Sequence, residues 1–149
     1  METAAKKYRG FEELDVYRAA REFRKKMYDL TRRLPDTEKY GLAGQVRRAA
    51  VSLTNNIGEG HGRFHYLDNI KFVLVSRGSL CELVDDLNTC EDERYLSPDE
   101  VVALKHEAER LMQLMNGYIR YLRDQKAGAA LQIHEDVASY GSECAELPE

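Results

Sequence analysis

The helical fold of this chain is most clearly indicated by the stretch SPDEVVALKHEAERLMQLMNGYIRYL at residues 97–122. Ser97 is a favourable helix N-cap, Pro98 fits the first helical position, and Glu100 stands three residues beyond the cap. This capping-box pattern predicts where the helix begins. Apolar side chains then recur at steps of three and four, so we expect one long amphipathic helix that packs against others. The residues of this face are Val101, Leu104, Ala108, Leu111, Met115, Tyr118 and Leu122.

Three earlier stretches show the same helical spacing of apolar residues, and none of convincing length alternates as a strand does. The first helix is expected at about 11–34, ended by Pro35 because the residue before a proline disfavours helical backbone. The second is expected to begin at Asp36 or Thr37, either of which can cap it, and the third to run from Tyr66 or Leu67 to about Glu93. The predicted buried seams are Val16, Ala20, Phe23, Met27, Leu30 and Leu34; then Leu42, Val46, Ala49, Leu53 and Ile57; then Leu67, Ile70, Leu74, Cys81, Val84 and Asn88.

Glycines supply two further expectations about these helices. Gly58, Gly60 and Gly62 are predicted to break the second helix, because glycine is a poor helix former. Gly78, followed by Ser79, is predicted to let a neighbouring backbone or bulky side chain approach the middle of the third helix.

Four helices joined by short links predict an all-α fold, an antiparallel up-down-up-down four-helix bundle. We assign this bundle to residues 1–126. Residues 127–149 hold five acidic residues and no Lys or Arg, and we expect an acidic C-terminal extension there, with a short helix and a disordered end.

Composition narrows the class of protein. The chain has 149 residues, of which 43% are hydrophobic and 32% are charged. No apolar run approaches the roughly 18 residues that span a bilayer, and the N-terminus has no signal-peptide pattern, so a cytoplasmic protein with no membrane partner is expected. Three cysteines without a CxxC pair argue against a disulfide framework or a zinc site.

The net charge of −4 is unevenly distributed along the chain. Residues 1–48 hold 13 Lys or Arg and 8 Asp or Glu, whereas residues 49–126 hold 9 and 13. The acidic total therefore does not exclude a nucleic-acid partner for the basic first half of the chain.

An ordered set of motifs in residues 8–126 resembles one family, the four-helix-bundle proteins of the 23S ribosomal RNA intervening-sequence family. The motifs are FEELDVY at 11–17, YGL at 40–42, QVRRAAVS at 45–52, NNIGEG at 55–60 with Gly62-Arg63, and RGSLCEL at 77–83. The resemblance implies an antiparallel bundle that assembles into a barrel-shaped homopentamer, with no established enzyme activity. It also implies a likeness to the accessory variability protein of diversity-generating retroelements, which works with a reverse transcriptase and RNA. Gly58 stands where the family's Ile-Ala-Glu-Gly motif has alanine.

Motifs of enzymes are missing from the sequence, which has no nucleophile elbow, P-loop, dinucleotide fingerprint or HExxH. Glu59, His61 and His65 form the one cluster with metal-ligand spacing, but the glycines around them predict a turn in which the two imidazoles are not aligned. We therefore expect no catalytic residues, no bound metal and no cofactor.

A polar row on the second helix permits two interpretations. Gln45, Arg48, Ser52, Asn55 and Glu59 recur at steps of three and four, so they share one face. As a structural row, Gln45, Ser52, Asn55 and Glu59, with Arg63, make hydrogen bonds and ion pairs inside the bundle or between subunits. In the other interpretation some of these side chains face a pore or cleft and bind a ligand.

The basic first half likewise has a structural and a functional interpretation. Arg18, Arg21, Lys25 and Arg32 share a helical face, which is either a solvated surface interleaved with acids or a phosphate-binding stripe. The candidate nucleic-acid-binding residues are Arg18, Arg21, Arg24, Lys25, Arg32, Arg33, Arg47 and Arg48.

The function predicted from these features is that of a non-enzymatic, homo-oligomeric scaffold or adaptor, with a pentamer as the expected assembly. It is expected to bind nucleic acid, with RNA favoured over DNA, through a basic face of its first two helices. A narrower version makes it the accessory subunit of a retroelement reverse transcriptase. The alternative is a purely structural protein-protein interaction module that binds no nucleic acid.

Overall fold

The computed structural model describes residues 10–63 and 65–126, and these form helices and connections without a strand. The four α-helices are α1 (Asp15–Arg33), α2 (Leu42–His61), α3 (Tyr66–Asp92) and α4 (Pro98–Gln125). Two short 3-10 helices precede the first two of them, η1 (Phe11–Glu13) and η2 (Asp36–Glu38). The predicted all-α fold with four helices is confirmed. The acidic extension predicted at 127–149 lies outside the described residues.

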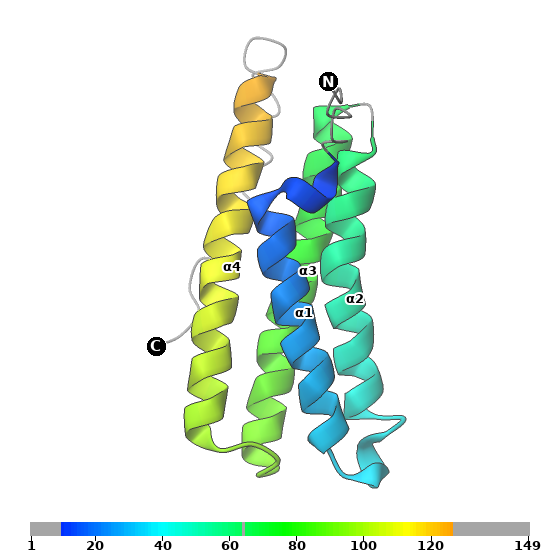
Figure 1. Cartoon of the computed structure of the whole chain (residues 1–149), viewed down its shortest axis with the longest axis vertical. Coiled ribbons are helices and arrows are strands. Elements are labelled where there is room, and N and C mark those ends of the chain that lie inside the picture. Colours follow the sequence, from blue (N-terminus) through cyan, green and yellow to red (C-terminus); the bar gives the residue numbers. More distant parts are fainter. Residues whose placement is uncertain (1–9, 64, 127–149) are drawn as a thin grey trace, which may run out of the picture.

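The four α-helices lie side by side along the long axis of the molecule (Figure 1). Each helix contacts the next one in the chain, and α1 also contacts α4. The chain turns back at each short connection, which is compatible with the expected up-and-down arrangement. Fully buried side chains from all four helices fill the centre, among them Phe23, Met27, Leu53, Ile57, Leu83, Leu87 and Met115.

The start of α1 differs from the prediction, because the helix begins at Asp15 and not near Phe11. Leu14 has extended backbone and separates α1 from η1. The ring of Phe11 packs edge-on against Tyr17, with 4.9 Å between the ring centroids. A 3-10 turn therefore folds this aromatic ring back onto the bundle. The end of α1 before Leu34 and Pro35 agrees with the prediction.

The start of α2 was also predicted too early. Asp36 and Thr37 belong to η2, and α2 begins at Leu42. The carboxylate of Glu38 accepts a hydrogen bond from the backbone N–H of Leu42, at 3.0 Å. An acidic side chain thus satisfies one of the unpaired N–H groups of the first turn from outside the helix.

The prediction that Gly58 and Gly60 break α2 is wrong, since the helix continues to His61. The third glycine of that prediction, Gly62, is the C-cap at which the helix ends. Gly60 is buried, and a Cβ atom there would lie 2.8 Å from Phe72 Cβ and 2.8 Å from Asn69 Oδ1. Gly60 therefore allows α3 to approach the last turn of α2. Gly78, where a close approach was expected, is exposed and has open space around the position of a Cβ.

The seam predicted for α3 is largely wrong. Of its six residues only Ile70 is buried, and the other five are half-buried. The buried face is rotated and includes the polar residues Asn69, Ser76, Arg77 and Asp86. Ser76 Oγ donates a hydrogen bond to the carbonyl of Leu53 at 2.7 Å, and Asn69 Nδ2 donates to Tyr118 Oη at 3.1 Å. Because they have these partners, Ser76 and Asn69 occupy buried positions that hydrophobic periodicity assigns to solvent.

The predicted start of α4 is confirmed in detail. Ser97 Oγ accepts a hydrogen bond from the backbone N–H of Glu100, whose carboxylate accepts one from the N–H of Ser97. Hydrogen bonds from Arg33 and from the backbone of Ser97 lower the pKa of the Glu100 carboxyl.

Among the described helices, none is long and apolar enough to cross a membrane.

Candidate nucleic-acid interface

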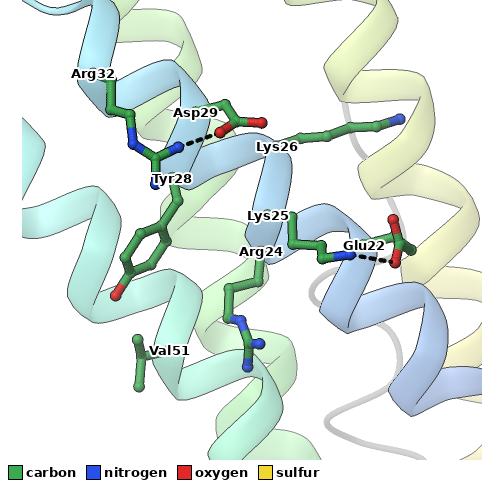
Figure 2. A pocket seen from close by; sticks show the side chains of 8 residues that line it. All are labelled: Glu22, Arg24, Lys25, Lys26, Tyr28, Asp29, Arg32 and Val51. Carbon is green, nitrogen blue, oxygen red and sulfur yellow. Dashed lines mark hydrogen bonds and ion pairs between the residues drawn. The ribbon is translucent and has the colours of Figure 1, made fainter.

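A groove runs along the surface between α1 and α2 and consists of two adjoining hollows. The first has a volume of about 760 Å³ and is lined mainly by α1 (Figure 2). The second, of about 500 Å³, is lined mainly by α2. Tyr28 and Val51 line both hollows and so mark their junction. We call this surface the α1–α2 groove; its residues are Glu22, Arg24, Lys25, Lys26, Tyr28, Asp29, Arg32, Arg47, Arg48, Val51, Ser52, Asn55, Asn56 and Glu59.

The structure brings five of the predicted nucleic-acid-binding residues to this groove. Arg24, Lys25 and Arg32 line the first hollow, and Arg47 and Arg48 line the second. The chain thus joins two basic segments of sequence on neighbouring helices into one surface.

The other three predicted residues do not line the groove. Arg18 and Arg21 are exposed on an earlier part of α1. Arg33 Nη2 pairs with the carboxylate of Glu100 on α4, at 2.9 Å.

The acids of the groove neutralise only part of its basic charge. Six Lys or Arg residues line it against three carboxylates. Lys25 pairs with Glu22, and Arg32 pairs with Asp29. Lys26 reaches away from the groove to Glu107 on α4 (Figure 2). Within the described part of the chain, the remaining basic residues, Arg24, Arg47 and Arg48, make no ion pair.

Two of these arginines are held by threonines of the opposite helix. Arg24 Nη1 on α1 donates to Thr54 Oγ1 on α2 at 2.8 Å. In the reverse direction, Arg47 Nε on α2 donates to Thr31 Oγ1 on α1 at 3.1 Å. Both threonine hydroxyls donate in turn to backbone carbonyls, Thr54 to Val51 and Thr31 to Tyr28. The two guanidinium groups are therefore fixed in place at the edge of the groove, with further N–H donors left over.

Tyr28 is the groove residue that sequence reasoning missed. Its side chain reaches from α1 toward α2 beside Val51 (Figure 2), and it is half-buried. The guanidinium carbon of Arg47 lies 5.9 Å from the centroid of its ring. Tyr28 is four residues after Arg24 and four before Arg32, so an aromatic residue on the face of a basic stripe was the signal available in the sequence.

The predicted polar row on α2 does not lie in the core of this chain. Gln45, Arg48, Asn55 and Glu59 are exposed, and Ser52 is half-buried. Four of the five line the groove, whereas Gln45 does not. The predicted ion pair between Arg63 and Glu59 is present, at 3.1 Å.

Ser52 connects the groove to α3. Its hydroxyl accepts hydrogen bonds from Ser79 Oγ at 2.7 Å and from Asn56 Nδ2 at 2.8 Å. A side chain that lines the groove is thus positioned by the helix behind it.

The histidines near the end of α2 do not form a cluster with Glu59 in the structure. The Glu59 carboxylate pairs with Arg63, and the ring of His61 lies edge-on to Phe11, with 6.4 Å between the centroids. Across the described residues, no three His, Cys, Asp or Glu side chains gather as metal ligands would.

A buried carboxyl lies apart from the groove, on the core face of α3. Asp86 is 5% exposed, and its Oδ2 atom has no hydrogen-bond partner among the described residues. Burial raises the pKa of this carboxyl from 3.8 to about 6, and the nearby Glu82 and Asp85 contribute to the rise. Burial and Asp86 likewise raise the pKa of the Cys90 thiol to about 11.

A known family matches a segment of the chain that spans both helices of the groove. The model of the family described as 23S rRNA-intervening sequence protein matches residues 12–117. Comparison with curated proteins finds no match. The matched segment is well over half of the chain, and residues 10–63 and 65–126 form an all-helical fold with four α-helices. The chain therefore belongs to the 23S rRNA-intervening sequence protein family.

Proposed function

We propose that this protein is a non-enzymatic scaffold that binds nucleic acid, in the first place RNA, through the α1–α2 groove. The observation that carries the proposal is the set of three groove arginines, Arg24, Arg47 and Arg48, that make no ion pair with a described residue. Arginine is well suited to phosphate, because its planar guanidinium presents several N–H donors at once. RNA is placed before DNA because of the resemblance to the accessory variability protein of diversity-generating retroelements, which works with a reverse transcriptase and RNA.

Neutralising phosphates releases condensed cations, so affinity for RNA is expected to fall steeply with salt. The test is fluorescence anisotropy with a labelled RNA between about 50 and 200 mM salt, the range over which phosphate binding shows its salt dependence. The variant Arg24→Gln/Arg47→Gln/Arg48→Gln should bind more weakly. Its slope of log affinity against log salt should be less steep by about 0.7–0.9 for each phosphate that the variant no longer neutralises.

The chain offers a matched control for this variant. Arg18→Gln/Arg21→Gln/Arg33→Gln removes the same number of charges from residues that line neither hollow of the groove. We expect this control to keep most of the affinity and nearly the whole salt slope. Equal reductions of affinity in both variants would show that overall charge, and not the groove, attracts RNA.

A homo-oligomer, with a pentamer as implied by the resemblance, is part of the proposal. Large apolar side chains are exposed on α3 and α4, among them Val75, Val102, Leu114 and Tyr121. Contacts between copies through these helices leave the α1–α2 groove accessible and repeat it around the assembly. Native mass spectrometry should then find particles of five chain masses, whereas a monomer at micromolar concentration would argue against this part.

The narrower proposal makes a retroelement reverse transcriptase the protein partner. It rests on the resemblance to the accessory variability protein of such elements. A reverse-transcriptase gene beside the gene for this chain, and co-purification of the two products, are the expected findings. If neither is found, the RNA-binding scaffold remains as a separate proposal.

The alternative function is a protein-interaction module with no affinity for nucleic acid. The exposed apolar side chains of α3 and α4 are the observation that favours it. Failure of the wild-type protein to bind RNA at about 50 mM salt, where phosphate binding is strong, would favour this alternative.

A further inference from the structure

Tyr28 stands at the junction of the two hollows and, among the described residues, is their only aromatic lining residue. It lines both hollows together with Val51, and its ring is half-buried between α1 and α2. Phosphate binding alone does not call for an aromatic side chain at this place. An aromatic ring in a basic groove is instead the arrangement on which an unpaired base stacks.

The two threonine-held arginines lie on either side of this ring along the groove. The Arg24–Thr54 bond joins the helices at one level, and the Arg47–Thr31 bond joins them at another. On each helix the two levels are seven residues apart, which corresponds to roughly 10 Å at the helical rise of about 1.5 Å per residue. Tyr28 lies between the two levels, four residues after Arg24 and three before Thr31.

The guanidinium groups are positioned before any ligand arrives. Each uses an N–H group on its threonine and keeps further donors for another acceptor. Neither makes an ion pair with a described residue, so a phosphate at the groove does not have to displace a carboxylate from them. Fixing the side chains in advance lowers the entropy cost of binding.

We infer that the α1–α2 groove takes single-stranded RNA, with one unpaired base stacked on Tyr28 and the flanking phosphates on Arg24 and Arg47. This inference rests on the proposed function and deepens it by naming the class of RNA. In a duplex the faces of the bases are covered by their neighbours, and only phosphates and groove edges are presented. A duplex can therefore use the arginines but not the ring of Tyr28.

The test compares two labelled RNAs on the full-length protein, an oligouridine of about 12 nucleotides and an RNA duplex of the same length, within the usual range of single-strand site sizes. Tyr28→Leu removes the aromatic ring and keeps an apolar side chain, whereas Tyr28→Phe keeps the ring. Tyr40→Leu is the matched control, because Tyr40 is 89% exposed, has Lys39 5.5 Å from its ring centroid and lines neither hollow.

The wild-type protein should bind oligouridine more tightly than the duplex. Tyr28→Leu should weaken oligouridine binding by roughly 5- to 150-fold, the range found when a stacking aromatic is removed, and should leave the salt slope unchanged. Arg24→Gln and Arg47→Gln should each reduce the salt slope by about 0.7, the amount expected when one phosphate of a single strand is no longer neutralised. Tyr28→Phe and Tyr40→Leu should behave as the wild type.

A second measurement does not depend on any variant folding. Oligouridine carrying 4-thiouridine should crosslink on irradiation to the wild-type peptide that contains Tyr28. Crosslinks confined to peptides outside α1 and α2 would overturn the inference. Equal affinity for single strand and duplex, together with unchanged binding by the Tyr28→Leu variant, would also overturn the inference. In that case the proposed RNA binding would still stand. Absence of RNA binding by the wild type would instead remove the proposed function and this inference with it.

Discussion

Asp86 is a carboxyl whose ionisation opposes folding. Its pKa is raised from 3.8 to about 6 in the folded protein, mainly by burial. The folded state therefore holds this proton more tightly than the unfolded chain does, and the free energy of unfolding falls as the pH rises from about 4 through 6. A shift of this size corresponds to roughly 2–3 kcal/mol, at about 1.4 kcal/mol per pKa unit.

Asp86→Asn removes the charge and keeps the shape of the side chain. We expect the variant to be more stable than the wild type by roughly 2–3 kcal/mol at about pH 8, and the difference to shrink toward zero near pH 4. Urea unfolding at both pH values measures it, with the exposed neighbour Asp85→Asn as control. A variant that is less stable at the higher pH would show that the Asp86 carboxylate has a stabilising partner.

At the residue scale, charge alone located part of the candidate site. Arg24 and Arg47 were chosen from the sequence as basic residues, but their threonine partners were not. Thr54 is 30 residues from Arg24 and Thr31 is 16 residues from Arg47, and no local pattern links residues so far apart. Tyr28 was missed because basic charge was the only criterion by which the candidate residues were chosen.

Between elements, Gly60 has the role of close approach that the sequence suggested for Gly78, and Gly78 does not interrupt α3. Gly60 lies against Asn69 and Phe72 at the contact of α2 with α3, and a Cβ there would come 2.8 Å from atoms of both residues. Phe72 Cβ is next to the backbone, so α3 itself has to shift to relieve the clash. Gly78 is solvent-exposed in the middle of α3 and meets nothing within 4 Å.

The two glycines predict opposite effects of the same substitution. Gly60→Ala should lower the free energy of unfolding by about 1–3 kcal/mol, the usual cost of overpacking. Gly78→Ala should raise it by about 0.5–1 kcal/mol, because alanine is the better helix former. Thermal and urea unfolding of both variants at one chain concentration measure these effects. A destabilising Gly78→Ala would reveal a neighbour at that position in the assembled protein.

The helices differ in how far their burial could be predicted. The face of α4 was predicted well because Val101, Ala108 and Leu111 are apolar and follow strict spacing. The face of α3 was not, because Ser76 and Asp86 are buried among its apolar residues. Ser76 is buried through a bond to a carbonyl on another helix, and such a partner is visible only in three dimensions.

At the scale of the whole molecule, ion pairs bridge the first helix to the last. Lys26 Nζ lies 2.6 Å from the carboxylate of Glu107, and Arg33 pairs with Glu100. Both pairs join α1 to α4, the helices farthest apart in the chain. Exposed pairs of this kind contribute up to about 1 kcal/mol each and weaken as salt rises.

Exchanging the two charges of the Lys26–Glu107 pair isolates this contribution. Lys26→Glu and Glu107→Lys should each destabilise the protein, because each places like charges side by side. The double variant should recover most of the stability, and the coupling should amount to about 0.5–1 kcal/mol at low salt. Urea unfolding of the four proteins at low and high salt provides the measurement. Additive effects without coupling would mean that the pair does not contribute to closing the bundle.

The bonds from α3 to the backbone and side chains of α2 have a consequence for the opposite face of α2. Ser76 and Ser79 hold Leu53 and Ser52 at one fixed level, so α2 cannot slide past α3 by a helical turn without leaving these groups unpaired. Ser52 lines the groove on the other side. The shape that α1 and α2 present to a ligand therefore depends on the position of α3, although no residue of α3 lines the groove.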